Sequence, residues 1–270
     1  MNKKLLSLPF IFWSAMFVIV PLCMVFYYGL TDKSGAFTLD NILAIATAEH
    51  SKALWEALKL SVISTVICLL LAYPLAMILC NMNVNQNSFL VLIFILPMWM
   101  NFLLRTLAWQ TLLEKTGVIN SILSTLHLPA LNIINTPSAI VLGMVYNFLP
   151  FMVLPLYNVL VKIDKSVINA AYDLGANGVQ TFVRIICPLS LPGMFSGITM
   201  VFVPALTTFV ISKILGGSKI LLIGNVIEQE FTQTGNWNLG SGLSIVLMLF
   251  IIFNMVISVI TDKEGEANTL

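Results

Sequence analysis

The amino-acid sequence predicts an all-α membrane protein whose helices cross the bilayer about six times. Of its 270 residues, 59% are hydrophobic and 9% are charged, whereas a soluble domain carries about a quarter charged residues. A transmembrane helix needs about 20 mostly apolar residues, and several segments meet that requirement. We expect the spans at Leu8–Leu30, Leu58–Cys80, Phe89–Leu113, Ser138–Val161, Leu191–Ile211 and Leu243–Thr261.

The stretches between these spans are short, so we expect a single transmembrane domain over residues 1–270. Met1 to Lys4 followed by an apolar run resembles a signal peptide. The run continues uncharged to Thr31 without a clear small-residue cleavage site, which favours an uncleaved anchor. The polar tract Asn81–Asn87 predicts a tight turn between the second and third spans. The stretches 32–57, 114–137 and 212–242 are expected to be amphipathic surface regions.

Charge and motif content exclude several functions. The formal net charge of +1 argues against nucleic acid as a partner, because domains that bind it carry basic patches. The four cysteines lie singly in or beside apolar spans, without the paired spacing of a metal site or a disulfide framework. No GxxxxGK[ST] phosphate loop and no catalytic constellation is present. We therefore expect no catalytic residue, no metal and no cofactor bound by this chain.

One stretch between the fourth and fifth spans is too polar to lie comfortably in lipid. Asp164 can cap a short helix, Lys165–Leu174, and Gly175 can end that helix by adopting the left-handed conformation. Four residues of the helix are predicted to share one apolar face. They are Val167, Ala170, Ala171 and Leu174.

A second short helix is predicted to follow. Asn177 and Gln180 have the spacing of a capping box, and the helix would run from there towards Pro188. Two helices of two to three turns are not stable alone in water. We therefore expect this loop to dock on another protein surface, with the alanines allowing a close approach.

These residues resemble the cytoplasmic loop of the permease subunits of bacterial ATP-binding-cassette importers. The family pattern is Glu-Ala-Ala, three residues, Gly, nine residues, then Ile-x-Leu-Pro. Asn169 replaces the Glu and Cys187 replaces the Leu, while the other positions match at Ala170, Ala171, Gly175, Ile185 and Pro188. The resemblance implies that the loop, residues 163–188, couples the chain to a separate ATPase. The coupling residues it implies are Asn169, Ala170, Ala171, Asp173, Gly175 and Pro188.

Three further stretches, Leu96–Trp109, Thr136–Tyr157 and Leu221–Phe231, look like the B-type permeases of spermidine/putrescine importers. This resemblance implies a type I importer permease fold in a bacterial inner membrane. It also implies a heterodimer with a similar second permease, two ATPase subunits that bind ATP and magnesium, and an extracytoplasmic polyamine-binding protein. Lysine and arginine are distributed almost evenly between the two sides, so they do not set the orientation. The loop must face the ATPase, which places both termini in the cytoplasm.

Polar residues on the third predicted span are candidates for the substrate pathway. Asn101, Arg105 and Trp109 are spaced at i, i+4 and i+8, which puts them on one stripe of a continuous helix. An arginine at this depth usually faces the bundle interior or a cavity. A helix-packing pair, or an arginine that reaches the outer interface, is the alternative, and both interpretations stay open.

Aromatic residues supply the other candidates. Trp13, Trp99 and Trp109 have the alternative explanation of an interfacial belt, but Trp99 follows Pro97 at an expected kink, where its ring would face a cavity. Tyr146 precedes Pro150 in a similar way. Aromatic faces attract ammonium groups, and because the six spans contain no carboxylate, we expect a weak, transient route.

Other functions remain open. An importer permease for another small solute is the nearest alternative. An ion-coupled secondary transporter usually carries ionisable residues near the membrane midplane, and only Arg105 approaches that position here. A membrane scaffold without transport activity is the third possibility.

Overall fold

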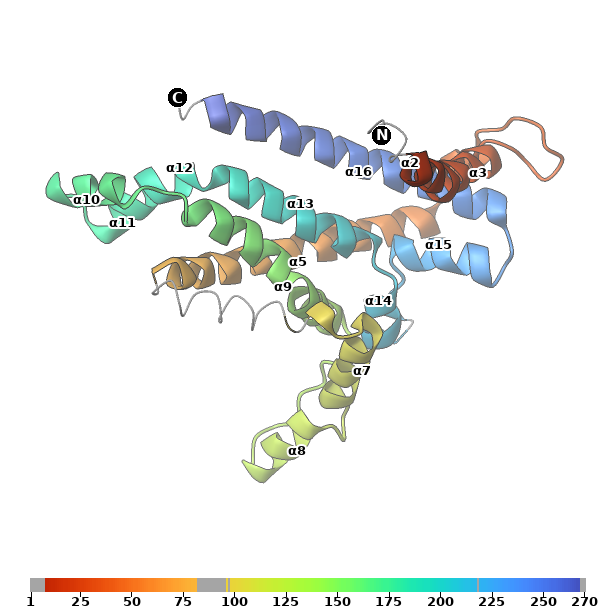
Figure 1. The fold of residues 1–270 in the computed structure, drawn as a ribbon. Coiled ribbons are helices and arrows are strands. Elements are labelled where there is room, and N and C mark those ends of the chain that lie inside the picture. Colours follow the sequence, from red (N-terminus) through yellow and green to blue (C-terminus); the bar gives the residue numbers. More distant parts are fainter. Residues whose placement is uncertain (1–7, 82–95, 97, 218, 268–270) are drawn as a thin grey trace.

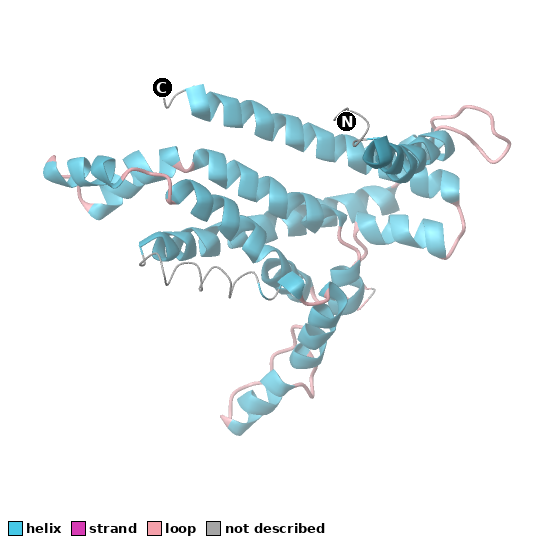
Figure 2. Cartoon of the chain, viewed as in Figure 1, coloured by secondary structure: helices cyan, strands magenta, loops and turns pink. Residues whose placement is uncertain are grey.

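The computed structural model describes residues 8–81, 96, 98–217 and 219–267. Over these residues the chain is built of helices and the turns between them (Figure 1; Figure 2). The described residues contain no β-strand, and Thr31 and Phe37 form an isolated antiparallel bridge. The all-α prediction is confirmed.

The described helices have a fixed order along the chain. In order they are α2 (Leu8–Ser14), η1 (Ala15–Ile19), α3 (Val20–Gly29), α4 (Asp40–Leu43), η2 (Ala44–Ala46), α5 (Ala48–Asn81), α7 (Phe102–Leu113), α8 (Val118–Thr125), α9 (Pro137–Leu160), α10 (Lys165–Asp173), α11 (Gly178–Thr181), η3 (Phe182–Ile186), α12 (Cys187–Leu189), α13 (Leu191–Thr207), α14 (Val210–Leu215), α15 (Ile223–Thr232) and α16 (Trp237–Ala267).

Most of the predicted spans have a helical counterpart. Within the described ranges, four helical stretches are long and apolar enough to cross a membrane, and a bent pair of helices makes a fifth. The four are Phe12–Gly29, Ala48–Cys80, Pro137–Leu160 and Trp237–Val256. The first part of the third predicted span, together with most of the Asn81–Asn87 turn, lies outside the described residues. The number six therefore stays a prediction.

The predicted end of the fifth span is wrong. We expected one helix to continue to Ile211, but α13 ends at Thr207 and α14 begins at Val210. The break is stabilised by a side chain from α15, because Asn225 donates from Nδ2 to the carbonyl oxygen of Phe209 at 3.0 Å. The same carbonyl accepts the first helical N–H of α14, from Lys213 at 3.0 Å, so Asn225 ties the start of α14 to α15.

The prediction that residues 212–242 form a surface region is also wrong in part. The first turn of α15, from Ile223 to Val226, is buried. The Oγ of Ser212, itself buried, bonds with the Oδ1 of Asn225 at 2.5 Å. The helix α15 is thus partly inserted among the other helices rather than lying on them.

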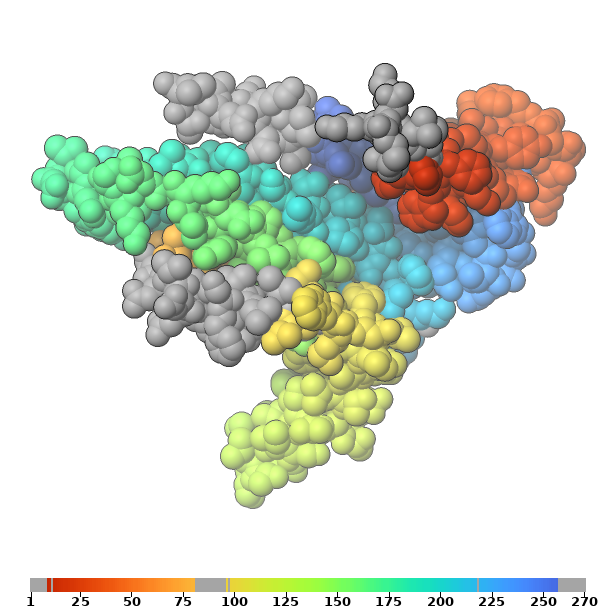
Figure 3. Space-filling model, viewed as in Figure 1, coloured from red at the N-terminus to blue at the C-terminus, as the bar shows by residue number. Residues whose placement is uncertain are grey.

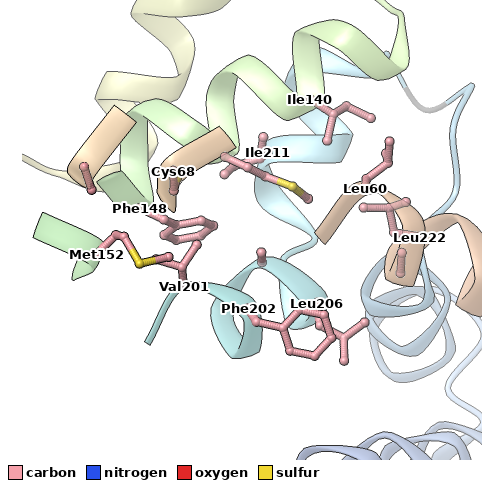
Figure 4. Packing of buried hydrophobic residues seen from close by; sticks show 14 of the residues in the cluster. Leu60, Cys68, Ile140, Phe148, Met152, Val201, Phe202, Leu206, Ile211 and Leu222 are labelled. Carbon is pink, nitrogen blue, oxygen red and sulfur yellow. The ribbon is translucent and has the colours of Figure 1, made fainter. Parts of the chain in front are cut away.

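The core lies where α5, α9 and α13 pack against one another. The buried face of α5 carries small residues four or so positions apart, which let neighbouring helices come close. They are Ala53, Ala57, Ser61, Ser64, Cys68, Ala72 and Ala76. On α13, a Cβ added to Gly197 would lie 2.7 Å from the Sδ of Met152. Figure 4 shows side chains of these helices and of α14 meeting in this core.

The long helix α5 extends beyond the thickness of a bilayer core. Its 34 residues at 1.5 Å per residue give about 51 Å, whereas the hydrocarbon layer is about 30 Å thick. The excess lies at its N-terminal end, where Glu49, Lys52, Glu56 and Lys59 occur. This end is therefore expected to stand in the aqueous phase.

Two parts of the chain lie outside the core. The stretch Phe12–Gly29 has only 6% of its residues buried. The helices α7 and α8 project from the body of the molecule in Figures 1 and 3, and α8 exposes Val118, Ile122 and Leu126. Such apolar surfaces require lipid or another protein chain as a neighbour.

Candidate functional site

The predicted docking loop, residues 163–188, forms one end of the molecule. In Figure 1 the helices α10 and α11 lie at this end, and α15 lies at the opposite end. Asp164 caps α10 as expected, because its Oδ1 accepts the backbone N–H of Ser166 at 2.8 Å. The helix covers Lys165–Asp173, one residue shorter than predicted.

Gly175 ends α10 in the expected left-handed conformation, with φ of +85°. The N–H of Gly175 bonds to the carbonyl of Tyr172 at 2.9 Å, and the N–H of Ala176 bonds to the carbonyl of Ala171 at 3.0 Å. These two bonds together form a Schellman motif. The predicted helix–glycine–helix arrangement is confirmed.

The second helix starts with the predicted capping box. The Oδ1 of Asn177 accepts the N–H of Gln180, and the Oε1 of Gln180 accepts the N–H of Asn177, both at 2.9 Å. The chain then stays helical through the π-helical turn η3 and α12 to Leu189. At that point it bends by 67° into α13.

The apolar face of α10 is turned away from the chain's own core. Ala171 is buried, but Leu174 is 89% exposed and Val167 is 44% exposed. These residues and Ala170 border a depression of about 540 Å³ between α10 and α11. Asn169, Asp173 and Pro188 are exposed as well. The loop therefore presents an unfilled, largely apolar surface.

The helical stripe predicted on the third span is wrong at its first residue. Asn101 lies outside the helix and caps it, with its Oδ1 accepting the N–H groups of Leu103 and Leu104 at 2.9 and 3.3 Å. The helix α7 starts at Phe102. Asparagine is among the best N-cap residues, and this local preference prevailed over continuation of the apolar helix.

Arg105 is buried, and part of its guanidinium has no hydrogen-bond partner among the described residues. Its side chain is 8% exposed, and within the described part of the chain its Nε and Nη1 have no hydrogen-bond acceptor. Asn147 on α9 is also buried, and its Oδ1 is likewise without a donor there. Unsatisfied buried polar groups are costly and concentrate at functional positions.

Trp109 and Tyr146, two of the predicted pathway residues, are brought together. Their rings meet edge to face between α7 and α9, with centroids 5.2 Å apart and an interplanar angle of 69°. Tyr146 keeps 38% of its surface exposed. This pair presents an aromatic surface of the kind that attracts ammonium groups.

In the described part of the chain, the rings of Trp13 and Trp99 do not contact this pair. Trp99 is 77% exposed, and Trp13 is 56% exposed with its ring 5.3 Å from that of Phe17. Exposed tryptophans suit both an interfacial belt and an open route. Both alternatives therefore remain for these two residues.

At the opposite end of the molecule, the carboxylate of Glu228 forms a salt bridge with Lys213. The Nζ of Lys213 lies 3.2 Å from the Oε1 of Glu228, which also borders a depression of about 490 Å³ between α13, α15 and α16. Phe209 and Phe231 line the same depression. No group of His, Cys, Asp or Glu side chains in the described ranges could hold a metal ion.

Sequence reasoning missed the residues that join the loop to the bundle. Tyr73 on α5 contacts both Phe182 and Ser190. Tyr73 and Ser190 are 117 positions apart, so no local pattern could have paired them. The only sequence signal was the polar hydroxyl of each residue within an apolar segment.

The fold and the exposed docking loop define a transport permease, and comparison with known proteins agrees. Residues 3–263 match the family model described as binding-protein-dependent transport system inner membrane component. The chain belongs to this family. It is therefore a membrane subunit of an importer rather than an enzyme.

Two individual relatives are similar to this chain over most of its length. The chain is 36% identical over 252 residues to the spermidine/putrescine transport system permease protein PotB of Haemophilus influenzae, covering 89% of this chain and 88% of that protein. It is 37% identical over 245 residues to PotB of Escherichia coli K12, covering 88% and 89%.

Solved structures share the fold at low sequence identity. A bacterial ATP-binding-cassette transporter that imports the acidic polysaccharide alginate superposes with a TM-score of 0.78 at 17% identity, covering 94% of each chain. The methionine transporter MetNI superposes with a TM-score of 0.55 at 16% identity, covering 80% of this chain and 95% of that one. The importer-permease fold is confirmed.

Proposed function

We propose that this chain forms part of the translocation pathway of an ATP-driven bacterial importer for polyamines such as spermidine and putrescine. The observation that carries the proposal is the exposed loop 163–188 together with the similarity to PotB proteins over almost nine-tenths of the chain. The substrate class follows from those relatives. The loop supplies a docking surface that its own chain leaves open.

The partners follow from the same similarity. We place a second, similar permease beside this one, two ATPase subunits at the loop end, and an extracytoplasmic polyamine-binding protein at the opposite end. A related alginate importer was solved with its periplasmic protein bound. ATP and magnesium would be bound by the ATPase, with no cofactor in this chain, and residues 1–270 would act as one permease domain.

The docking surface would consist of the residues that border or flank the depression between α10 and α11. Ala170 and Ala171 allow a close approach, Gly175 sets the angle between the two helices, and Asp173 offers a polar contact. Asn169 and Pro188 complete this surface. A short helix seated in a groove is a common form of such docking.

The pathway would use the aromatic pair and its neighbours. Trp109 and Tyr146 offer ring faces, while Arg105 places a positive charge nearby along α7 and disfavours tight binding of a polycation. Trp13, Trp99 and Asn101 are the remaining candidates. Weak binding suits a route that must release its substrate on the other side.

The substrate assignment is tested by measuring which solute stimulates ATP hydrolysis by the complex. The complete complex is reconstituted in proteoliposomes, and ATP hydrolysis is measured with the binding protein empty or loaded. We expect spermidine or putrescine to raise hydrolysis only in the presence of the binding protein. Stimulation by an unrelated solute, with none by either polyamine, would overturn the substrate assignment and leave the importer class intact.

A further inference from the structure

Tyr73 connects the transmembrane helix α5 to the loop end of the molecule. Its side chain is 9% exposed. The hydroxyl is hydrogen-bonded to the Oγ of Ser190, and the ring meets that of Phe182 edge to face with centroids 5.2 Å apart. A single residue of the bundle therefore contacts both the start of η3 and the end of α12.

Ser190 occupies the bend between the loop and the bundle. The helical stretches Gly178–Leu189 and Leu191–Thr207 meet at 67° on either side of it. Pro188 and Pro192 flank this position and have no N–H, so each removes one helical hydrogen bond. Ser190 keeps its own backbone bonds, because its N–H donates to Ile186 and its carbonyl accepts from Met194, each at 3.0 Å. With two helical hydrogen bonds removed, the backbone at the bend is less constrained than in a regular helix, and side-chain contacts add to what sets its angle.

The hydrogen bonds at the bend form a directed chain. Ser190 donates from Oγ to the carbonyl of Cys187 at 3.0 Å. A serine hydroxyl carries one proton, so both bonds are made when Tyr73 donates to Ser190. The Tyr73 hydroxyl is buried, and its bond to Ser190 is kept only while the bend keeps this geometry.

The apolar contacts near the bend are less directional than the hydrogen bond between Tyr73 and Ser190. A small cavity of about 50 Å³ separates the inner ends of α5 and α9 from the loop. Its lining is entirely apolar apart from one thiol and consists of Met77, Cys80, Leu160, Ile163, Ile168 and Ile186. Apolar contacts around a void fix an angle less sharply than a directional hydrogen bond does.

We propose that Tyr73 is a positioning residue that sets the angle between the loop 163–188 and α13 through the hydroxyl of Ser190. In this role it transmits displacement of the loop into the transmembrane helices. The inference rests on the proposed function, because it requires that an ATPase moves the loop.

The test measures coupling rather than folding. The variants Tyr73→Phe and Ser190→Ala, and the double variant, are reconstituted with the second permease, the ATPase and the binding protein. The quantity measured is the ratio of polyamine imported to ATP hydrolysed. We expect each single variant to lower this ratio by about two- to tenfold, because that factor corresponds to the loss of one hydrogen bond. ATPase co-purification should be unchanged, because the docking surface is intact.

The double variant and a control make the result specific. Since both single changes remove the same Tyr73–Ser190 bond, the double variant should fall no lower than the more affected single variant. Ser64→Ala is the matched control, because Ser64 is a buried hydroxyl on the same helix that donates to the Sδ of Met144 on α9 instead. It should import normally per ATP.

Several outcomes would overturn the proposal. Wild-type coupling in either single variant, additive losses in the double variant, or an equal loss in Ser64→Ala would each do so. If Tyr73→Phe fails to reach the membrane, Ser190→Ala reports on the same bond. Import by the wild-type complex without ATP would instead contradict the proposed function, so the two failures are distinguishable.

Discussion

The carboxylate of Asp164 determines where α10 begins. The backbone N–H and the side chain of Ser166 bond to this carboxylate and hold the pKa of Asp164 below its ordinary value. Because the folded pKa is lowered, the capping contribution is present above the ordinary carboxyl range and is lost as the pH falls through the folded pKa.

The cap predicts that amide hydrogen exchange at Ser166 depends on pH and that one substitution at Asp164 removes this dependence. Below about pH 4, amide hydrogen exchange at Ser166 should become faster in the wild type, relative to its intrinsic rate. Asp164→Asn keeps a capping oxygen that does not titrate and should show no such change. Asp164→Ala should exchange faster at every pH. An identical pH profile in the wild type and Asp164→Asn would contradict this account of the cap.

The ring of Trp109 is expected to contribute to polyamine passage. Trp109→Leu removes the aromatic face and should lower the rate of uptake by about two- to fivefold, the factor given by a cation–π contact of about 0.5–1 kcal/mol. Trp109→Phe keeps an aromatic face and should retain most of the uptake at equal membrane levels. Trp99→Leu should behave like Trp109→Leu. Unchanged kinetics in both leucine variants would assign both tryptophans to the interfacial belt.

At the level of elements, Gly175 sets the geometry of the coupling loop. A Cβ at this position meets no atom within 4 Å, so the cost of a substitution comes from the positive φ alone. Gly178 is equally open, and its φ lies outside the left-handed region. The two glycines therefore form a matched pair that separates backbone conformation from crowding.

The pair yields a direct prediction. Gly175→Val should cost about 1–2 kcal/mol locally and misdirect α10, so that ATPase co-purification and uptake both fall. Gly178→Ala should leave both unchanged. Membrane insertion should survive in each variant, because the apolar spans are untouched. Full ATPase binding and uptake in Gly175→Val would remove the loop from the coupling mechanism.

The ends of the coupling helices could be predicted from sequence because their signals are local. Asp164, Gly175, Asn177 and Gln180 act on backbone groups within a few positions, and each has the expected bond or dihedral angle. The break after Thr207 could not be predicted in this way. It involves a tertiary contact, because Asn225 donates to the carbonyl of Phe209 from 16 positions farther along the chain.

The candidate pathway was only partly predictable for the same reason. The presence of Arg105, Trp109 and Tyr146 within apolar segments could be read from the sequence, and their membrane depth stays a prediction. Their arrangement depends on how α7 and α9 pack, which placed Trp109 against Tyr146. The helix start at Phe102 removed Asn101 from the expected stripe.

For the whole molecule, the arrangement of helices separates two functional ends. The loop 163–188 and the C-terminal end of α16 lie towards one end in Figure 1, and α15 lies towards the other. This arrangement supports placing the loop and the C-terminus on the same side of the membrane. In our proposal that side is the cytoplasm.

Cysteine labelling tests this orientation. A single cysteine in place of Tyr172, which is 51% exposed on α10, is introduced into a variant lacking the native cysteines. We expect a membrane-impermeant reagent to label it in inverted vesicles and not in intact cells. Labelling from outside the cell would contradict the orientation, whatever the substrate.

The source of energy tests the central claim, that this permease is driven through its loop by a separate ATPase. The measurement is polyamine uptake into proteoliposomes holding the complete complex, with loaded binding protein outside and either ATP or a non-hydrolysable analogue within. We predict uptake with ATP, none with the analogue, and no dependence on an imposed proton or sodium gradient. Gradient-driven uptake that continues without ATP or the ATPase would contradict the account and identify an ion-coupled transporter instead.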